Sequence, residues 1–206
     1  MNGGATGSVD AMPSDDLQVL VNQVRTCTRC RLAQTRTFAV PGHGDPAAPL
    51  MLVAEAPGAR EDATGLPFQG MAGRFLNRCL ADLGVVREEL YITSTNKCRP
   101  PGNRAPKPDE MAACAGYLDR QLALVKPEVV LAMGGTAARR LHPLATGRSV
   151  RLADLRAAGA TVAGSRRLLV TYHPAAAMRF PAQRQPFIDD LRDACELAGL
   201  VGVAGS

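Results

Sequence analysis

Four of the six cysteines in this 206-residue chain stand at spacings that suit a shared metal centre. Cys27 and Cys30 have two residues between them, the spacing at which both sulfurs of a tight loop face one metal. Cys98 and Cys114 have fifteen residues between them (positions 99 to 113), too many for the second short loop of a zinc ribbon. Iron–sulfur clusters draw cysteines from separate elements. We therefore expect a metal site, with a cluster favoured over zinc and ordinary half-buried thiols as the alternative.

The elements that must position these residues alternate between strands and helices. Apolar or β-branched runs predict strands at 50–54, 90–95, 128–133 and 167–172. Amphipathic patterns predict long helices at 15–25, 72–83, 109–125 and 185–200. The alternation indicates an α/β fold, a three-layer α/β/α arrangement around a central four-stranded, mostly parallel sheet.

Between these elements the chain is rich in glycine, proline and charge. We expect loops at 38–49 and 59–70, and an irregular stretch at 143–164 with a small edge hairpin as one option. The remaining cysteines, Cys79 and Cys195, fall inside amphipathic helical patterns, so we expect them in the core.

Polar side chains follow the predicted strands, where open parallel sheets bind their ligands. Glu55 comes directly after the first strand, on a stiff Ala-Pro-Gly turn, and could orient or activate a water with help from Glu61. His173 follows the fourth strand and could donate a hydrogen bond to a developing anion. Loop bracing by Glu55 and a structural histidine are the alternatives. Because both residues border one predicted crevice, we favour catalysis.

Two loops have the composition of a nucleic-acid surface. Phe68 sits on a Gly/Pro loop, where a base could stack on it, or it could anchor that loop in the core. The basic loop 99–104 could follow a DNA backbone or simply surround the metal site. The net charge is +5, and only three of the 24 basic residues are lysines. Arginine suits phosphate contacts, although a GC-rich genome also favours it.

The length fits one domain, which we place at residues 14–200. Residues 1–13 are rich in glycine, alanine and serine and are expected to be disordered, and residues 201–206 to form a flexible tail. No apolar run is long enough to span a membrane, and the start lacks the features of a signal peptide. We expect a monomeric, cytoplasmic, nucleoid-associated protein whose cysteines are thiols or metal ligands.

Taken in order, these motifs resemble the type 4 uracil-DNA glycosylases, the iron–sulfur branch of the uracil-DNA glycosylase superfamily. The resemblance covers residues 17–200, and six motifs together are far more specific than any one. The motifs are Cys-Thr-Arg-Cys-Arg-Leu from Cys27, Glu-Ala-Pro-Gly-Ala-Arg-Glu-Asp from Glu55, Gly-Leu-Pro-Phe-Gln-Gly from Gly65, Lys-Cys-Arg-Pro-Pro-Gly-Asn-Arg from Lys97, Ala-Cys-Ala from Ala113 and His-Pro-Ala-Ala-Ala-Met-Arg from His173.

The resemblance implies a role for each matching residue. Glu55 would position the attacking water with support from Glu61, and His173 would stabilise the leaving uracil anion. Phe68 would stack on the flipped uracil, and Arg179 would brace the DNA-side loop. Further positions are implied by the same match: a [4Fe-4S] cluster with a structural role on Cys27, Cys30, Cys98 and Cys114, a loop asparagine at Asn103, and substrate contacts at Ala56 and Gly58.

One departure concerns the base-reading position. The family usually has an asparagine four residues before the third cysteine, where this chain has Ser94. A hydroxyl cannot make the paired donor and acceptor contacts that separate uracil from cytosine. Asn96 points to the same strand face roughly 6–7 Å further along and is a candidate substitute.

The resulting prediction is a monofunctional glycosylase that removes uracil from single- or double-stranded DNA and leaves an abasic site for base excision repair. No lysine stands where it could form a Schiff base, so strand cleavage is not expected. The alternatives are a glycosylase for another deaminated base, a non-catalytic iron–sulfur DNA-binding protein, and a zinc-ribbon-like structural protein.

Overall fold

The computed structural model describes residues 16–142 and 150–202. The segment predicted to be disordered, 1–13, lies outside this part, as do all but two residues of the predicted tail at 201–206. Short 3-10 turns, labelled η, complement the helices and strands. The elements are α1 (Leu17–Arg25), η1 (Arg31–Gln34), β1 (His43–Gly44), β2 (Leu50–Ala54), α2 (Ala59–Thr64), α3 (Met71–Asp82), η2 (Arg87–Glu89), β3 (Tyr91–Ser94), η3 (Pro101–Asn103), α4 (Pro108–Val125), β4 (Val129–Met133), α5 (Gly135–Leu141), α6 (Leu152–Ala157), β5 (Thr161–Ala163), β6 (Arg166–Thr171), α7 (Pro174–Arg179) and α8 (Pro181–Leu197).

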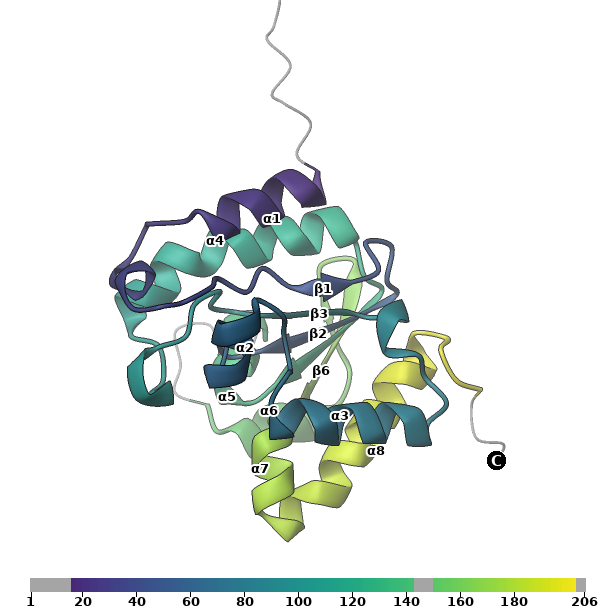
Figure 1. The fold of residues 1–206 in the computed structure, drawn as a ribbon. Helices are drawn as coiled ribbons and strands as arrows, with labels where there is room; N and C mark the ends of the chain where they lie inside the picture. The colour runs from purple at the N-terminus through teal and green to yellow at the C-terminus, as the bar shows by residue number, and fades with distance from the viewer. Residues whose placement is uncertain (1–15, 143–149, 203–206) are drawn as a thin grey trace, which may run out of the picture.

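One sheet organises the described residues, and it confirms the predicted α/β class. Its strand order is β1-β3-β2-β4-β6-β5, and the four inner strands pair in parallel (Figure 1). The predicted number of strands was wrong, because the sheet has six. The two additional strands, β1 and β5, pair antiparallel at the edges. They have two and three residues and no fully buried position, so they lack the apolar run that reveals a strand in a sequence.

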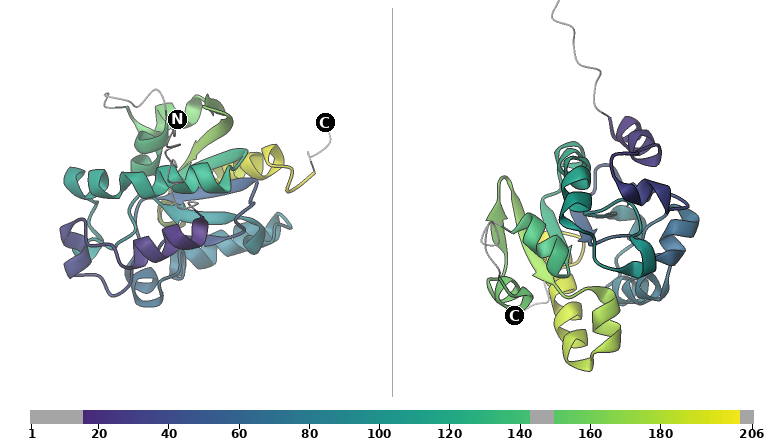
Figure 2. Two further views of the ribbon diagram at one scale, coloured as in Figure 1. Left: turned by 90° about the horizontal axis from the view of Figure 1, so that it is seen from above. Right: turned by 90° about the vertical axis from the view of Figure 1, so that its left-hand side faces the viewer.

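Helices cover both faces of the sheet, as the views in Figures 1 and 2 show. Alternate residues of β2 explain this, because Leu50 and Leu52 pack toward α3 and α8 while Met51 and Val53 pack toward α4, α5 and α6. All five residues of β2 are buried. Helix α1 lies outside α4 and completes a third apolar cluster with it. None of the helices in the described part of the chain is both long and apolar enough to cross a membrane.

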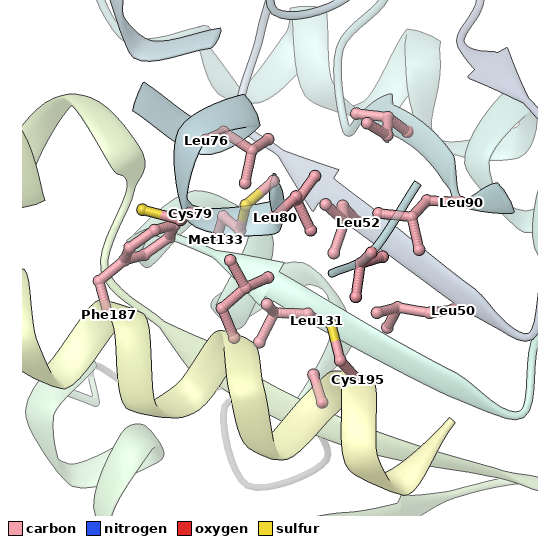
Figure 3. Close-up of a cluster of buried hydrophobic side chains, with 14 of the residues drawn as sticks. Leu50, Leu52, Leu76, Cys79, Leu80, Leu90, Leu131, Met133, Phe187 and Cys195 are labelled. Carbon is pink, nitrogen blue, oxygen red and sulfur yellow. The ribbon is translucent and has the colours of Figure 1, made fainter. Parts of the chain in front are cut away.

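The first apolar cluster lies between the sheet and helices α3 and α8 (Figure 3). Phe187 on α8 is fully buried there, and its ring centroid lies 5.6 Å from that of Phe75 on α3. The predicted core cysteines, Cys79 and Cys195, belong to the same cluster and are 5% and 0% exposed, which confirms their assignment. The cluster also includes Ala177 of α7, the short helix that follows β6, so α7 packs on this face of the sheet.

One predicted loop contains a helix. Residues 59–64 form α2, inside the segment 59–70 that was expected to be irregular. Glu61 helps to start the helix, because its side chain accepts a hydrogen bond from the backbone N–H of Gly58, the half of a capping box that a glycine N-cap allows. The helix ends at Gly65, whose φ of 73° suits glycine. A helix of fewer than two turns carries too little periodicity to be recognised in the sequence.

We expect Phe187→Ala to lower the free energy of unfolding by about 3–5 kcal/mol, because it leaves a cavity in the core. Urea unfolding followed by circular dichroism measures the effect. Phe180→Ala is the matched control, since Phe180 is 49% exposed and its replacement should cost less than about 1 kcal/mol. Equal losses in the two variants would contradict this description of the core.

Candidate active site and cysteine site

A cavity of about 880 Å³ opens at the carboxyl ends of the parallel strands. The register of β2 against its neighbours brings these ends together, since Ala54 pairs with Ser94 on β3 and Val53 pairs with Ala132 on β4. Nine of the ten side chains predicted to act on or bind the substrate line this cavity. They are Glu55, Ala56, Gly58, Glu61, Phe68, Ser94, Asn103, His173 and Arg179.

Glu55 follows β2 directly and is held by a residue that the sequence analysis missed. Thr136, in the first turn of α5, donates a hydrogen bond from its hydroxyl to Oε2 of Glu55. The backbone is fixed as well, because the carbonyl of Glu55 accepts bonds from Thr95 Oγ1 at 2.6 Å and from the Asn96 N–H at 3.0 Å. One carboxylate oxygen is thereby oriented, and the other has no protein partner in the described residues.

His173 caps the amino end of α7 with its ring. Its Nδ1 accepts a hydrogen bond of 3.1 Å from the backbone N–H of Ala175. In the neutral ring the proton therefore sits on Nε2, which becomes the donor. Burial lowers the pKa of His173, and the carboxylates of Glu55 and Glu61 only partly oppose this. The histidine is thus held as a neutral hydrogen-bond donor at the cavity.

Phe68 and Asn103 reach the cavity in a strained backbone conformation. Their φ angles are 54° and 56°, in the left-handed region that residues with a side chain seldom adopt. Gly73 helps to hold Phe68, because a Cβ at Gly73 would lie only 1.8 Å from the Phe68 carbonyl oxygen. The Phe68 ring stacks on His173, with centroids 5.9 Å apart and planes inclined by 23°. Strain of this kind is commonly kept where a side chain must face a ligand.

Glu61, the predicted support of Glu55, has its carboxylate engaged with the backbone around the cavity. Its two carboxylate oxygens accept backbone N–H bonds from Gly58 at 3.0 Å, Gln69 at 2.7 Å and Gly70 at 2.9 Å. These bonds connect the turn after β2 to the loop that carries Phe68. A carboxylate engaged in this way braces the cavity wall, and the supporting role of Glu61 in catalysis stays a prediction.

Asn96 is the predicted residue that does not line the cavity. It is 1% exposed, and its amide nitrogen donates to the carbonyl of Glu110 on α4 at 3.1 Å. The chain turns after β3, so the alternation of an extended strand does not continue to Asn96. The expectation that Asn96 replaces an asparagine at position 94 is therefore wrong. Ser94 itself lines the cavity, with its hydroxyl donating to the Asn96 carbonyl at 2.6 Å.

The remaining predicted contacts lie around the rim. Ala56 and Gly58 form the turn after β2, where the Gly58 N–H is taken by Glu61. Asn103 belongs to η3 and accepts a hydrogen bond of 2.7 Å from Arg99 through its side chain. Arg179 ends α7, with its guanidinium carbon 5.8 Å from the centroid of the Phe180 ring. These side chains leave a rim with both basic and aromatic groups.

The four predicted metal-binding cysteines also come together, behind the cavity. Cys27 follows α1 and Cys30 precedes η1, whereas Cys98 follows β3 and Cys114 lies on α4. All four line one small space and belong to or border the cluster between α1 and α4. None of them is in a disulfide. The chain thus gathers thiols from distant elements, as the spacing analysis predicted.

Sequence comparison decides the family of this fold. The family model described as "Uracil DNA glycosylase superfamily" matches residues 41–194 of this chain. A type-4 uracil-DNA glycosylase of Pyrobaculum aerophilum is 43% identical, over 85% of this chain and 91% of its own. Those of Saccharolobus solfataricus and Archaeoglobus fulgidus are 38% and 37% identical, over 86% and 90% of this chain and 84% and 94% of theirs. The chain belongs to the uracil-DNA glycosylase superfamily. Its similarity is to the type-4 branch, as the motifs indicated.

The type-4 branch implies an iron–sulfur cluster, and the surroundings of the cysteines fit one. Arg36 donates to Cys98 Sγ at 2.9 Å, and the backbone N–H of Lys97 donates to Cys114 Sγ at 3.3 Å. Such N–H donors and nearby positive charge stabilise sulfur that carries negative charge. Burial raises the pKa of Cys98 to about 11, so binding must displace its proton.

A single metal ion fits less well. Within residues 16–142 and 150–202, no three or more His, Cys, Asp or Glu side chains are placed so that they could hold one. The four cysteines line one small shared space. The preference for a cluster over zinc therefore rests on the similarity to the type-4 branch.

The loop between the cysteine site and the cavity is anchored by an ion pair. Arg104 makes two parallel bonds to the buried carboxylate of Glu110, at 2.8 and 2.7 Å. The Arg104 hydrogen bonds hold the pKa of Glu110 at about 2. Since Glu110 lies on α4 one turn before Cys114, this ion pair fixes loop 99–104 to the helix that supplies the fourth thiol.

We expect His173 to titrate below the ordinary histidine pKa of about 6.5, because burial opposes its charged form. The imidazole signals followed by NMR across pH measure this, and His173→Gln assigns them. The same residue in urea-unfolded protein serves as the reference near 6.5. A pKa of His173 in the folded protein at or above that in the unfolded protein would contradict this, because the attraction of Glu55 and Glu61 would then outweigh burial. The expected sign also predicts that stability falls as the pH drops below about 6.5, because unfolding then takes up a proton.

Proposed function

We propose that this protein is a monofunctional uracil-DNA glycosylase that hydrolyses the N-glycosidic bond of uracil in DNA. The observation that carries the proposal is the meeting of Glu55, Phe68 and His173 in one cavity. A carboxylate, an aromatic face and a neutral hydrogen-bond donor are the groups that this reaction needs. The relatives named type-4 uracil-DNA glycosylases support the same substrate.

In the proposed reaction the uracil nucleotide leaves the base stack and enters the cavity. Phe68 offers its ring as the surface on which the base stacks. His173 presents Nε2–H to a uracil oxygen, and the bond from the Ala175 N–H keeps the other ring nitrogen in its acceptor form. As the C–N bond breaks, negative charge grows on the base, and this hydrogen bond strengthens.

Glu55 acts on the sugar side. Loss of the base leaves an oxocarbenium-like sugar, which a water attacks. The carboxylate of Glu55 orients this water and takes up its proton through the oxygen that Thr136 leaves free. Thr136 is a positioning residue in this account. The products are uracil and an abasic site.

The positions of the three lysines support the proposal that the protein does not cleave the DNA strand. Schiff-base chemistry requires an amine that can reach the sugar. Lys97 is 1% exposed and its ammonium is fully engaged by protein oxygens. Lys107 and Lys126 are exposed and do not line the cavity. The abasic site therefore remains for the later enzymes of base excision repair.

In the proposed holoprotein Cys27, Cys30, Cys98 and Cys114 hold a [4Fe-4S] cluster. When bound, this cofactor cross-links three segments of the chain and has a structural role. Its position behind loop 99–104 supports a part in shaping the DNA-facing surface. We further propose that the protein acts as a monomer on uracil in single- or double-stranded DNA, in the cytoplasm and at the nucleoid. The net charge of +5 favours binding to the negatively charged backbone of DNA.

An oligonucleotide with one uracil, treated with alkali after incubation, tests the proposed activity. We expect cleavage at the uracil position only after alkali. His173→Ala should lower the single-turnover rate by about 10²–10³, the loss typical of an oxyanion donor. His43→Ala is the matched control, since His43 is exposed at the sheet edge and does not line the cavity. Full activity of His173→Ala would refute the assigned role.

The hydroxyl of Ser94 favours a second candidate, a glycosylase for another deaminated base. Because this hydroxyl donates to the Asn96 carbonyl, it offers only lone pairs to the cavity. An acceptor matches the N–H of uracil, but it equally matches the N–H of hypoxanthine. Ser94 therefore discriminates less between uracil and hypoxanthine than an asparagine amide at this position would.

We expect Ser94→Asn to increase the preference for uracil over hypoxanthine, by about 1–3 kcal/mol of transition-state free energy. Single-turnover rates on matched oligonucleotides with one lesion each measure the preference. The wild-type protein serves as the reference. The neighbouring variant Thr95→Asn is unsuitable as a control, because the Thr95 hydroxyl donates to the Glu55 carbonyl. If wild-type protein released hypoxanthine faster than uracil, the second candidate would replace the first.

A further inference from the structure

Lys97 is a buried cation whose surroundings the proposed reaction leaves unexplained. It lies three residues after β3 and is 1% exposed. Its Nζ donates to Thr93 Oγ1 at 2.7 Å, to the Ser94 carbonyl at 2.6 Å and to Gln121 Oε1 at 2.6 Å. Thr93 and Ser94 line the cavity, and we call these two residues the cavity floor. Lys97 therefore lies directly behind the floor.

The three contacts suit a charged lysine. The Gln121 amide is oriented by its nitrogen, which donates to the Pro41 carbonyl at 2.5 Å and to the Tyr91 hydroxyl at 3.1 Å. Its oxygen must therefore face Lys97 as an acceptor. The Ser94 carbonyl is also an acceptor, and Thr93 Oγ1 can send its own proton to the Pro41 carbonyl at 3.0 Å. Nζ thus faces two oxygens that can only accept and one hydroxyl, an arrangement that an ammonium with three N–H donors satisfies fully.

No carboxylate neutralises this ammonium in the part of the chain that the structure describes. A buried charge without an ionic partner is costly, so some negative charge is expected nearby. Burial lowers the pKa of Lys97, whereas the nearby sulfurs of Cys114 and Cys98 favour its charged form. Nζ makes no hydrogen bond to these sulfurs among the described contacts. Its bonds lead to the floor, where the departing base becomes an anion.

We propose that Lys97 is a positioning residue that prepares the cavity floor for a negatively charged base. It occupies oxygen lone pairs of Thr93 and Ser94 that would otherwise repel the anion, and it places a positive charge behind them. This inference rests on the proposed glycosylase reaction. Its effect belongs to the transition state, since the base carries little charge before the C–N bond stretches.

The test compares two leaving groups in the same DNA sequence, uracil and 5-fluorouracil. The electron-withdrawing fluorine stabilises the base anion, so 5-fluorouracil needs less help from the protein. We expect Lys97→Met to slow single-turnover release of uracil about 10-fold, less than the 10²–10³ of a direct donor. Release of 5-fluorouracil should slow clearly less, and the concentration of DNA at half-maximal rate should hardly change.

The ratio of the two rates is the decisive quantity, because it does not depend on the fraction of protein that is folded. Lys97→Gln, which retains two N–H donors without the charge, is a second variant in case the methionine disturbs packing. Lys126→Met is the matched control, since Lys126 is exposed at the end of α4 and loses the same charge. It should leave the ratio at the wild-type value.

Three outcomes decide the matter. A higher ratio of 5-fluorouracil to uracil release in the Lys97 variants supports the proposal. An unchanged ratio overturns it, and loss of the cluster's visible absorption in the same variants would then assign Lys97 to the cysteine site. If wild-type protein released neither base, the proposed function itself would fail, which the wild-type reaction shows independently of any variant.

Discussion

The parallel pairing of β2 between β3 and β4 is the constraint on which the rest of the structure depends. It places Ala54 beside Ser94 and Val53 beside Ala132, so the residues after three strands converge at one edge. Every residue of β2 is buried. A shift of its pairing by one residue would move each of these side chains to the opposite face of the sheet. The packing of the core thus sets the position of Glu55, and with it the position of the cavity.

Around this edge, loops with unusual backbone conformations are held by backbone hydrogen bonds. Glu61 connects the turn after β2 to the loop of Phe68, and Gly73 allows α3 to pack against that loop without a Cβ. Phe68 and Asn103 keep positive φ angles at this edge. The cavity wall is therefore preorganised, which is the condition under which fixed donors stabilise a transition state well.

The cysteine site and the cavity share one short stretch of chain. Between Ser94 and Cys98 the backbone passes from the cavity floor to the third thiol, and Lys97 contacts both through different atoms. On the other side, α4 carries Cys114 together with Glu110, which anchors loop 99–104 through Arg104. A change at the cysteines therefore has a direct covalent route to the floor and to the loop beside it.

The sequence by itself determined the parallel core, the gathering of four cysteines and the placing of Glu55 and His173 at strand ends, because these follow from local patterns and from the geometry of parallel sheets. Only the tertiary structure decided what lies beside them. The pairing of Thr136 with Glu55 depends on strand order, which no local pattern encodes. Asn96 was misplaced because side-chain alternation stops where the strand ends. The sequence places Lys97 at a strand end, but only the tertiary structure shows that it is buried and which oxygens surround its ammonium.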